Sequence, residues 1–284
     1  MSFLAAFRFL TVIPLPLRRE PTGEEVGRSL VYFPVVGLLI GLLLAGINWV
    51  LRLFMPDGIV NALLIVAMVL VSGALHIDGF IDTCDGLAGN KPPEERWKVM
   101  KDSRAGAFGI AGAVLLVLVK YAALSAVPVH LLAATLVLTP MVSRWAMVYA
   151  VWAYPYALES GLGTVFKRAA NGATVVVTTI FTVAVAFLLM WWAGVTYHSP
   201  IVPTPPPPGW SLLNHWWPNV AFGLAAAAVI VAVVWLVTIL WAAYMRRKFA
   251  GLTGDSYGAV NEMAEVVVLA TVAVLAYNGW LWVW

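Results

Sequence analysis

Three aspartates lie close together in the stretch "HIDGFIDTCDG". Asp78, Asp82 and Asp85 are spaced by four and three residues, so on a helix they share one face while His76 points roughly the opposite way. Like charges at this spacing repel each other. Mg²⁺ removes such repulsion and prefers oxygen ligands from a few carboxylates, water and substrate phosphate. The spacing predicts a magnesium site, against the alternative of a solvated helix end whose acidic residues happen to align.

A second acidic group lies in "GLTGDSYGAVNEMAE", near the end of the chain. On a helix Asp255, Glu262 and Glu265 fall within about 80° of arc. Glu262 and Glu265 begin the last apolar run, where ionisable side chains are functional candidates. Two cations lie inside other apolar runs. Arg144 is expected to meet a phosphate or one of these acids, and Lys120 to form half of a structural ion pair.

The segment "NKPPEERWKVMKDSRAGAFGIAG" follows the three aspartates. Pro92 and Pro93 favour the start of a short amphipathic helix, and "RAGAFG" suits a flexible connection. Asp102 and Arg104 lie beside glycines where a ligand can approach the backbone, and arginine binds phosphate oxygens with a bidentate fork. The alternative is a basic loop that sets topology and attracts anionic lipid, which we favour for the lysines of this segment.

Composition indicates the elements that must position these residues. Of 284 residues, 62% are hydrophobic and only 11% are charged, whereas soluble domains carry about a quarter charged residues. We therefore expect one all-α transmembrane catalytic domain over residues 1–284, with short interfacial helices, the first at the N-terminus. A single cysteine excludes an intramolecular disulfide and a CxxC metal site. About seven transmembrane helices are expected, at 31–53, 58–75, 108–127, 129–151, 173–194, 220–245 and 262–283.

The distribution of basic residues predicts the orientation. All of the 17 Lys and Arg except Arg52, Lys120 and Arg144 lie at the N-terminus or in alternate connections. The positive-inside rule then places the N-terminus in the cytoplasm and the C-terminus outside the cell membrane. Residues 76–107 become a cytoplasmic active-site loop, and residues 195–219 an outer Pro-rich loop.

Two acidic groups, arginines and glycine turns thus gather on one predicted face. This combination favours a metal-assisted phosphoryl transfer in which metal ions bridge a diphosphate. A positioned carboxylate would accept the proton of the attacking hydroxyl.

Several segments together resemble the cobalamin synthase family, the adenosylcobinamide-GDP ribazoletransferases. They are "FRFLTVIPLP", "FPVVGLLIG", "HIDGFIDTCDGLAG", "VMKDSRAGAFG", "RWAMVYAVWAYPYALESGLGTVF" and "GLTGDSYGAVNEMAE". The resemblance runs through most of the chain in order, apart from the Pro-rich loop. Ser143 stands where the family usually has Gly, and Cys84 where it usually has Ala.

The resemblance implies an Mg²⁺-dependent enzyme of the cell inner membrane with its active site facing the cytoplasm. It would join adenosylcobinamide-GDP to α-ribazole or α-ribazole 5′-phosphate, giving adenosylcobalamin or its phosphate and GMP. Membrane lipid is the expected surrounding, nucleic acid is not a partner, and a homo-oligomer is left open. His76 is either a proton carrier or a structural cap, and no general base is assigned. The implied groups are catalytic (Asp82, Asp85, Asp102, Arg104), metal-binding (Asp78, Asp82, Asp85) and substrate-binding (Arg104, Arg144, Asp255, Glu262, His76).

A lipid-synthesising phosphotransferase and a membrane transporter are the two alternative functions. A CDP-alcohol phosphotransferase also cleaves a nucleotide diphosphate with aspartates on membrane helices, but its signature D-G-x2-A-R-x8-G-x3-D-x3-D is not met. A transporter could use the buried charges as an ion path. The charges instead gather at one face, and no pair of interrupted helices with internal symmetry is evident.

Overall fold

The computed structural model describes residues 1–15, 19–198 and 212–278 and is built of helices. Within these residues the only β-type pairing is an isolated bridge between Tyr156 and Leu252. The helices are α1 Ser2–Leu10, α2 Gly23–Arg28, the 3-10 turn η1 Ser29–Tyr32, α3 Phe33–Leu51, α4 Asp57–Val71, α5 Leu75–Leu87, α6 Pro93–Met100, α7 Ala107–Ala126, α8 Val129–Ala153, α9 Leu162–Ala169, α10 Gly172–His198, α11 Leu212–Phe249 and α12 Gly254–Tyr277.

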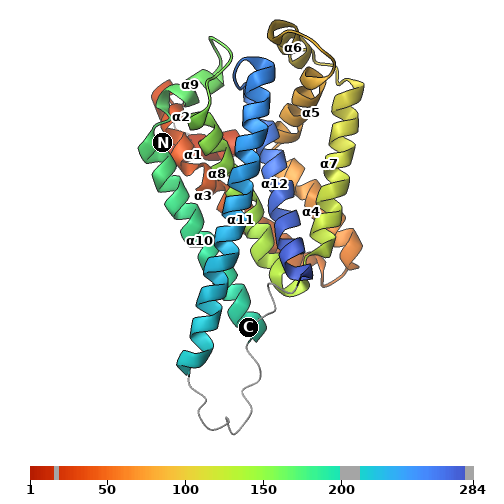
Figure 1. Cartoon of the computed structure of the whole chain (residues 1–284), viewed down its shortest axis with the longest axis vertical. Helices are drawn as coiled ribbons and strands as arrows, with labels where there is room; N and C mark the ends of the chain where they lie inside the picture. The colour runs from red at the N-terminus through yellow and green to blue at the C-terminus, as the bar shows by residue number, and fades with distance from the viewer. Residues whose placement is uncertain (16–18, 199–211, 279–284) are drawn as a thin grey trace.

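The long helices confirm the predicted membrane bundle. Six helical segments among the described residues are long and apolar enough to cross a membrane, and the bent pair α4–α5 makes a seventh if it counts as one span. The short helices α1, α2, α6 and α9 all lie toward one end of the bundle (Figure 1). We call this end the α6/α9 end.

Helix α8 forms the centre of the bundle, and 94% of the residues in its most apolar stretch are buried. It is nevertheless the least apolar of the six candidate spans, and its buried residues include Ser143 and Arg144. Helix α3 packs against it through two glycines at GxxxG spacing, which let helix backbones approach closely. A Cβ on Gly41 would lie 2.5 Å from the Cα of Val137, and Gly37 meets Pro140 in the same way.

The predicted second span is interrupted before the aspartates. Helix α4 ends at Val71, and α5 starts at Leu75 at an angle of 87° to it. Gly73 and Ala74 between them have φ of 61° and 60°, the left-handed conformation that ends a helix. The backbone N–H of Ala74 donates to the carbonyl of Val69 at 2.9 Å and closes the end of α4. This turn directs α5 toward the α6/α9 end (Figure 1).

Two other predicted boundaries differ from the structure. Helix α12 begins at Gly254, about two turns before the predicted 262, because the side-chain oxygen of Thr253 caps it by accepting from the Ser256 N–H at 3.2 Å. The connection predicted over 195–219 is shorter, since α10 continues to His198 and α11 begins at Leu212. The Pro-rich core of that connection lies outside the described residues.

Candidate functional site

Close packing of α5 on α12 brings the two acidic groups together. A Cβ on Gly79 would lie 2.8 Å from the carbonyl oxygen of Asp255, and one on Gly258 would lie 3.0 Å from that of His76. Backbone contact at these glycines places Asp82 within electrostatic range of Asp78 and Asp255. The beginning of α12 therefore joins the acidic face of α5.

These carboxylates form an open group. Asp78 is exposed, and Asp82 and Asp255 are half-buried. Among the described residues no three His, Cys, Asp or Glu side chains are arranged to hold a metal ion on their own. Mg²⁺ is usually bound by one or two carboxylates, with water and substrate phosphates completing its shell. The donor set therefore fits an Mg²⁺ ion brought with a phosphate ligand and does not form a closed protein cage.

Asp85 has a different environment from the other two aspartates of α5. Its carboxylate is buried and accepts the backbone N–H of Gly106 at 2.7 Å and that of Gly109 at 2.8 Å. These N–H groups belong to the first turn of α7, where a carboxylate is stabilised by unpaired donors and the helix dipole. Asp85 thus fixes α7 against α5. Its predicted role as a metal ligand and catalytic residue stays a prediction.

Asp102 and Arg104 lie in the loop between α6 and α7. Arg104 donates from Nε to Asp102 Oδ1 at 3.1 Å and from Nη2 to Oδ2 at 2.9 Å. These hydrogen bonds lower the pKa of the Asp102 carboxyl to about 2. The Arg104 side chain is 86% exposed, so its guanidinium is accessible to a phosphate that would replace the carboxylate.

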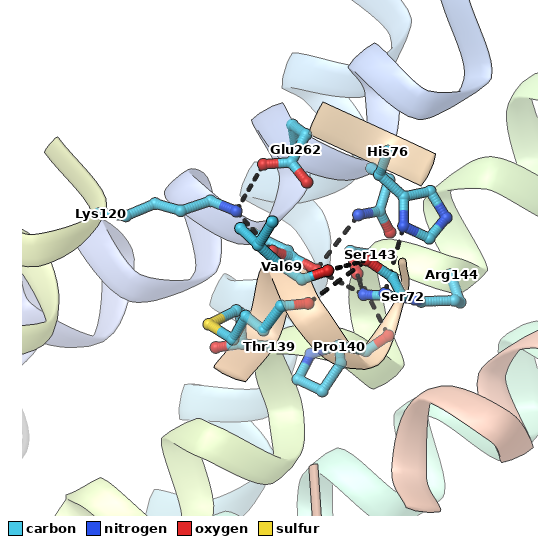
Figure 2. Close-up of polar contacts among 12 residues, drawn as sticks. Val69, Ser72, His76, Lys120, Thr139, Pro140, Ser143, Arg144 and Glu262 are labelled. Atoms are coloured by element: carbon cyan, nitrogen blue, oxygen red, sulfur yellow. Dashed lines mark hydrogen bonds and ion pairs between the residues drawn. The ribbon is translucent and has the colours of Figure 1, made fainter. Parts of the chain in front are cut away.

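A buried network of ion pairs includes Lys120, Arg144 and Glu262 (Figure 2). Lys120 Nζ donates to Glu262 and to Glu265, each at 2.6 Å. Arg144 pairs with the second oxygen of Glu265, and its Nη2 lies 3.4 Å from Nδ1 of His76. Two cations and two carboxylates therefore balance each other inside the bundle.

The network confirms the structural ion pair expected for Lys120. It also gives Arg144 an acidic partner, one of its two predicted contacts. The network joins α5, α7, α8 and α12, because each supplies at least one member. Breaking such a buried pair from one side costs about 3–5 kcal/mol, since the remaining charge is left uncompensated. Substrate contacts of Arg144 and Glu262 stay predictions.

A cavity of about 220 Å³ opens beside the carboxylates. Asp78 and Asp255 are among its lining residues. Three phenylalanines, Phe9, Phe33 and Phe166, also line it, with ring centroids 5.2–5.8 Å apart. Sequence reasoning missed this aromatic wall, because its rings come from α1, α3 and α9. The only available signal was that all three rings lie within segments of the family resemblance.

Carboxylates gathered on apolar helices are costly unless a ligand uses them. The fold and this group of carboxylates define a multi-pass membrane protein with an open acidic site at one end of its bundle. The family model described as cobalamin-5-phosphate synthase matches residues 2–273, and the chain belongs to this family.

Curated relatives agree with the family match over almost the whole chain. The adenosylcobinamide-GDP ribazoletransferase of Geotalea daltonii is 37% identical over 273 residues, covering 96% of this chain and 97% of the relative. The proteins of the same name from Pseudomonas syringae pv. syringae and Roseiflexus sp. are 33% and 31% identical. They cover 97% and 95% of this chain, and 100% and 88% of their own lengths. No solved structure matches the chain significantly.

Proposed function

We propose that this protein joins adenosylcobinamide-GDP to α-ribazole or α-ribazole 5′-phosphate, as the names of its relatives imply. The observation that carries the proposal is the meeting of Asp78 and Asp82 of α5 with Asp255 of α12 at the open end of the bundle. A metal ion offsets the repulsion between these carboxylates and also binds the oxygens of a diphosphate.

The reaction is a displacement at phosphorus. A ribose hydroxyl of α-ribazole attacks the phosphorus on the cobinamide side, and the bond from that phosphorus to the bridging oxygen breaks. The bridging oxygen leaves with GMP, and the hydroxyl proton passes to a base. Because Asp78, Asp82 and Asp255 are accessible to solvent, each can reach the attacking hydroxyl or the phosphate oxygens.

Asp78 and Asp82 of α5, with Asp255, would hold Mg²⁺ in this site. When bound, the ion neutralises charge on the diphosphate and on the leaving phosphate. Arg104 adds a bidentate donor to phosphate oxygens from the α6–α7 loop, and Asp102 orients its fork in the absence of substrate. Asp85 accepts a hydrogen bond from Gly106 at the start of α7, so the end of the α6–α7 loop is fixed to α5, the helix that carries Asp78 and Asp82.

We further propose that the α6/α9 end faces the cytoplasm of a bacterial-type inner membrane. The basic residues of α6, α9 and the end of α11 support this orientation through the positive-inside rule. Both nucleotide-derived substrates would then reach the site from the cytoplasmic side.

The proposal is tested with the full chain purified into liposomes and supplied with adenosylcobinamide-GDP, α-ribazole and Mg²⁺. We expect GMP release that requires both organic substrates and stops when EDTA removes the metal. GMP release that continues without α-ribazole would show hydrolysis in place of transfer. No release with either ribazole form would contradict the proposed function.

A further inference from the structure

Apolar and acidic side chains both line the cavity beside the carboxylates. Its apolar lining includes Phe9, Phe33 and Phe166, together with Met147 of α8. At about 220 Å³ the cavity holds a ligand of one or two fused rings, well below the usual 300–1,000 Å³ of drug-sized sites. Its acidic lining includes Asp78 and Asp255, so a ligand in the cavity would reach the reaction site.

Two buried polar atoms on the cavity wall have no hydrogen-bond partner among the residues that the structure describes. They are Nε2 of His76, a residue only 1% exposed, and the hydroxyl of Tyr257, a residue 4% exposed. An unpaired buried polar group costs about 1–3 kcal/mol. Such groups on the wall of a cavity indicate a ligand that pairs with them.

The contact with Arg144 defines which proton His76 offers. A guanidinium only donates hydrogen bonds, so Nδ1 of His76 must be the acceptor in the 3.4 Å contact with Arg144 Nη2. The neutral imidazole then carries its proton on Nε2. Figure 2 shows the second ring nitrogen of His76 pointing away from Arg144. His76, which lines the cavity, therefore carries its ring proton on the nitrogen that has no partner among the described residues.

We propose that this cavity binds the aromatic base of α-ribazole, an inference that rests on the proposed function. The base is a flat bicycle with two methyl groups and one unsubstituted ring nitrogen. That nitrogen has a lone pair to accept the His76 Nε2–H. The ring faces suit an aromatic wall. The ribose attached to the base then extends toward Asp78 and Asp255, which places the attacking hydroxyl next to the carboxylates.

The other parts of the two substrates fit this cavity poorly. A corrinoid macrocycle is several times larger than a bicycle and cannot enter it. Guanine has carbonyl, amide and amino groups along its edges, and most of them would face the side chains of Phe and Met without partners, at a cost for each. The unpaired ring N–H of His76 matches a base with a single acceptor, and the unpaired Tyr257 hydroxyl remains for an oxygen of the ribose attached to that base.

Leu162, the first residue of α9, lines the cavity and is exposed, so a larger side chain there is compatible with folding. We expect Leu162→Trp to raise the KM for α-ribazole about 10-fold or more, because the larger side chain would fill part of the cavity and even one added methylene in an apolar pocket changes discrimination by about that factor. The KM for adenosylcobinamide-GDP should not change. The α-riboside of unmethylated benzimidazole should recover much of the lost efficiency. Leu188→Trp is the matched control on α10, also exposed but outside the cavity.

A second variant tests the unpaired hydroxyl. Tyr257→Phe should raise the KM for α-ribazole about 3- to 10-fold, the effect of one hydrogen bond. Its melting temperature should be unchanged or higher, because the hydroxyl is unpaired without ligand. An unchanged KM for α-ribazole in both variants, with wild-type turnover normal, would overturn the inference. A rise in the KM for adenosylcobinamide-GDP alone would also overturn it. If the wild-type protein itself shows no turnover, the result would instead contradict the proposed function.

Discussion

Asp82 is the carboxylate that the structure makes most dependent on a ligand. It is half-buried and within electrostatic range of Asp78, Asp85 and Asp255, with no cation paired to it among the described residues. The neighbouring Asp85 accepts two backbone N–H groups at the start of α7. The two side chains lie one helical turn apart, yet only Asp85 is held by donors of another helix.

Replacing Asp82 by asparagine should therefore remove activity without loss of fold. We expect Asp82→Asn to lower kcat by at least about 100-fold, as loss of a metal-site or transition-state contact does. Its melting temperature should be equal to or above that of wild type, because like-charge repulsion is relieved. Asp57→Asn is the matched control and should show normal turnover. Asp57 is an exposed aspartate at the start of α4 that pairs with Arg52. Activity near wild type in Asp82→Asn would remove this residue from the site.

The buried network predicts an asymmetry between its two glutamates. Glu265 pairs with both Lys120 and Arg144, whereas Glu262 pairs only with Lys120. Glu265→Gln leaves Arg144 without a carboxylate partner among the described residues and should lower stability by about 3–5 kcal/mol. Glu262→Gln leaves both cations paired with Glu265 and should cost less. Thermal unfolding in detergent measures both. A loss in Glu262→Gln that equals or exceeds the loss in Glu265→Gln would contradict this assignment.

Helices α5 and α7 meet through glycines and one carboxylate. A Cβ on Gly109 would collide with Asp85 and lie 2.9 Å from the backbone carbonyl of Ile81. At Gly106 the added atom would lie 2.5 Å from Asp85 Oδ1. This contact sets the position of the α6–α7 loop, and with it Arg104.

Gly109→Ala should consequently weaken the joint between α5 and α7. We expect a lower melting temperature and a raised KM for adenosylcobinamide-GDP, since the loop with Arg104 shifts. Gly46→Ala is the matched control in α3, where an added Cβ meets open space. There alanine should be neutral or stabilising by up to about 1 kcal/mol. Equal behaviour of the two variants would show that close contact at Gly109 does not matter.

Some elements could be predicted from the sequence because their signals are local. Pro92 and Pro93 start α6, as expected, with Pro93 in its first turn. The helical spacing of the α5 aspartates also holds. The break before α5 could not be predicted, because Ala74 takes a left-handed conformation that alanine rarely adopts. The early start of α12 depends on the N-cap Thr253. The sequence did not single out this residue, because several neighbouring residues also favour turns.

The site itself depends on contacts between distant segments. The sequence indicated Asp78, Asp82 and Asp255 as candidates from charge, helical spacing and the family resemblance, but their meeting requires α5 to pack on α12 at Gly79. The pairing of Asp85 with α7 and the aromatic wall of the cavity arise in the same way. Apolar periodicity predicts which helices form, but it carries no information on which faces meet.

The short helices α1, α2, α6 and α9 lie toward the α6/α9 end of the bundle. We therefore expect residues at this end to be accessible from only one side of the membrane. Cys84 is the one cysteine of the chain, so Cys84→Ala gives a background for labelling. Glu94→Cys on α6 should react with an impermeant maleimide only from the cytoplasmic side of membrane vesicles. Leu53→Cys, exposed after α3, should react only from the opposite side. The reverse pattern would invert the proposed orientation.

Following the cobinamide-side phosphate into the products is the most direct test of the proposed reaction. Adenosylcobinamide-GDP labelled with ¹⁸O in the non-bridging oxygens of its cobinamide-side phosphate is incubated with the protein, α-ribazole and Mg²⁺, and the products are analysed by mass spectrometry. Attack at the cobinamide-side phosphorus predicts labelled adenosylcobalamin and unlabelled GMP in equal amounts. Release of labelled GDP or labelled inorganic phosphate, or no corrinoid joined to ribazole, would contradict the assignment of this chain as a ribazole-transferring enzyme.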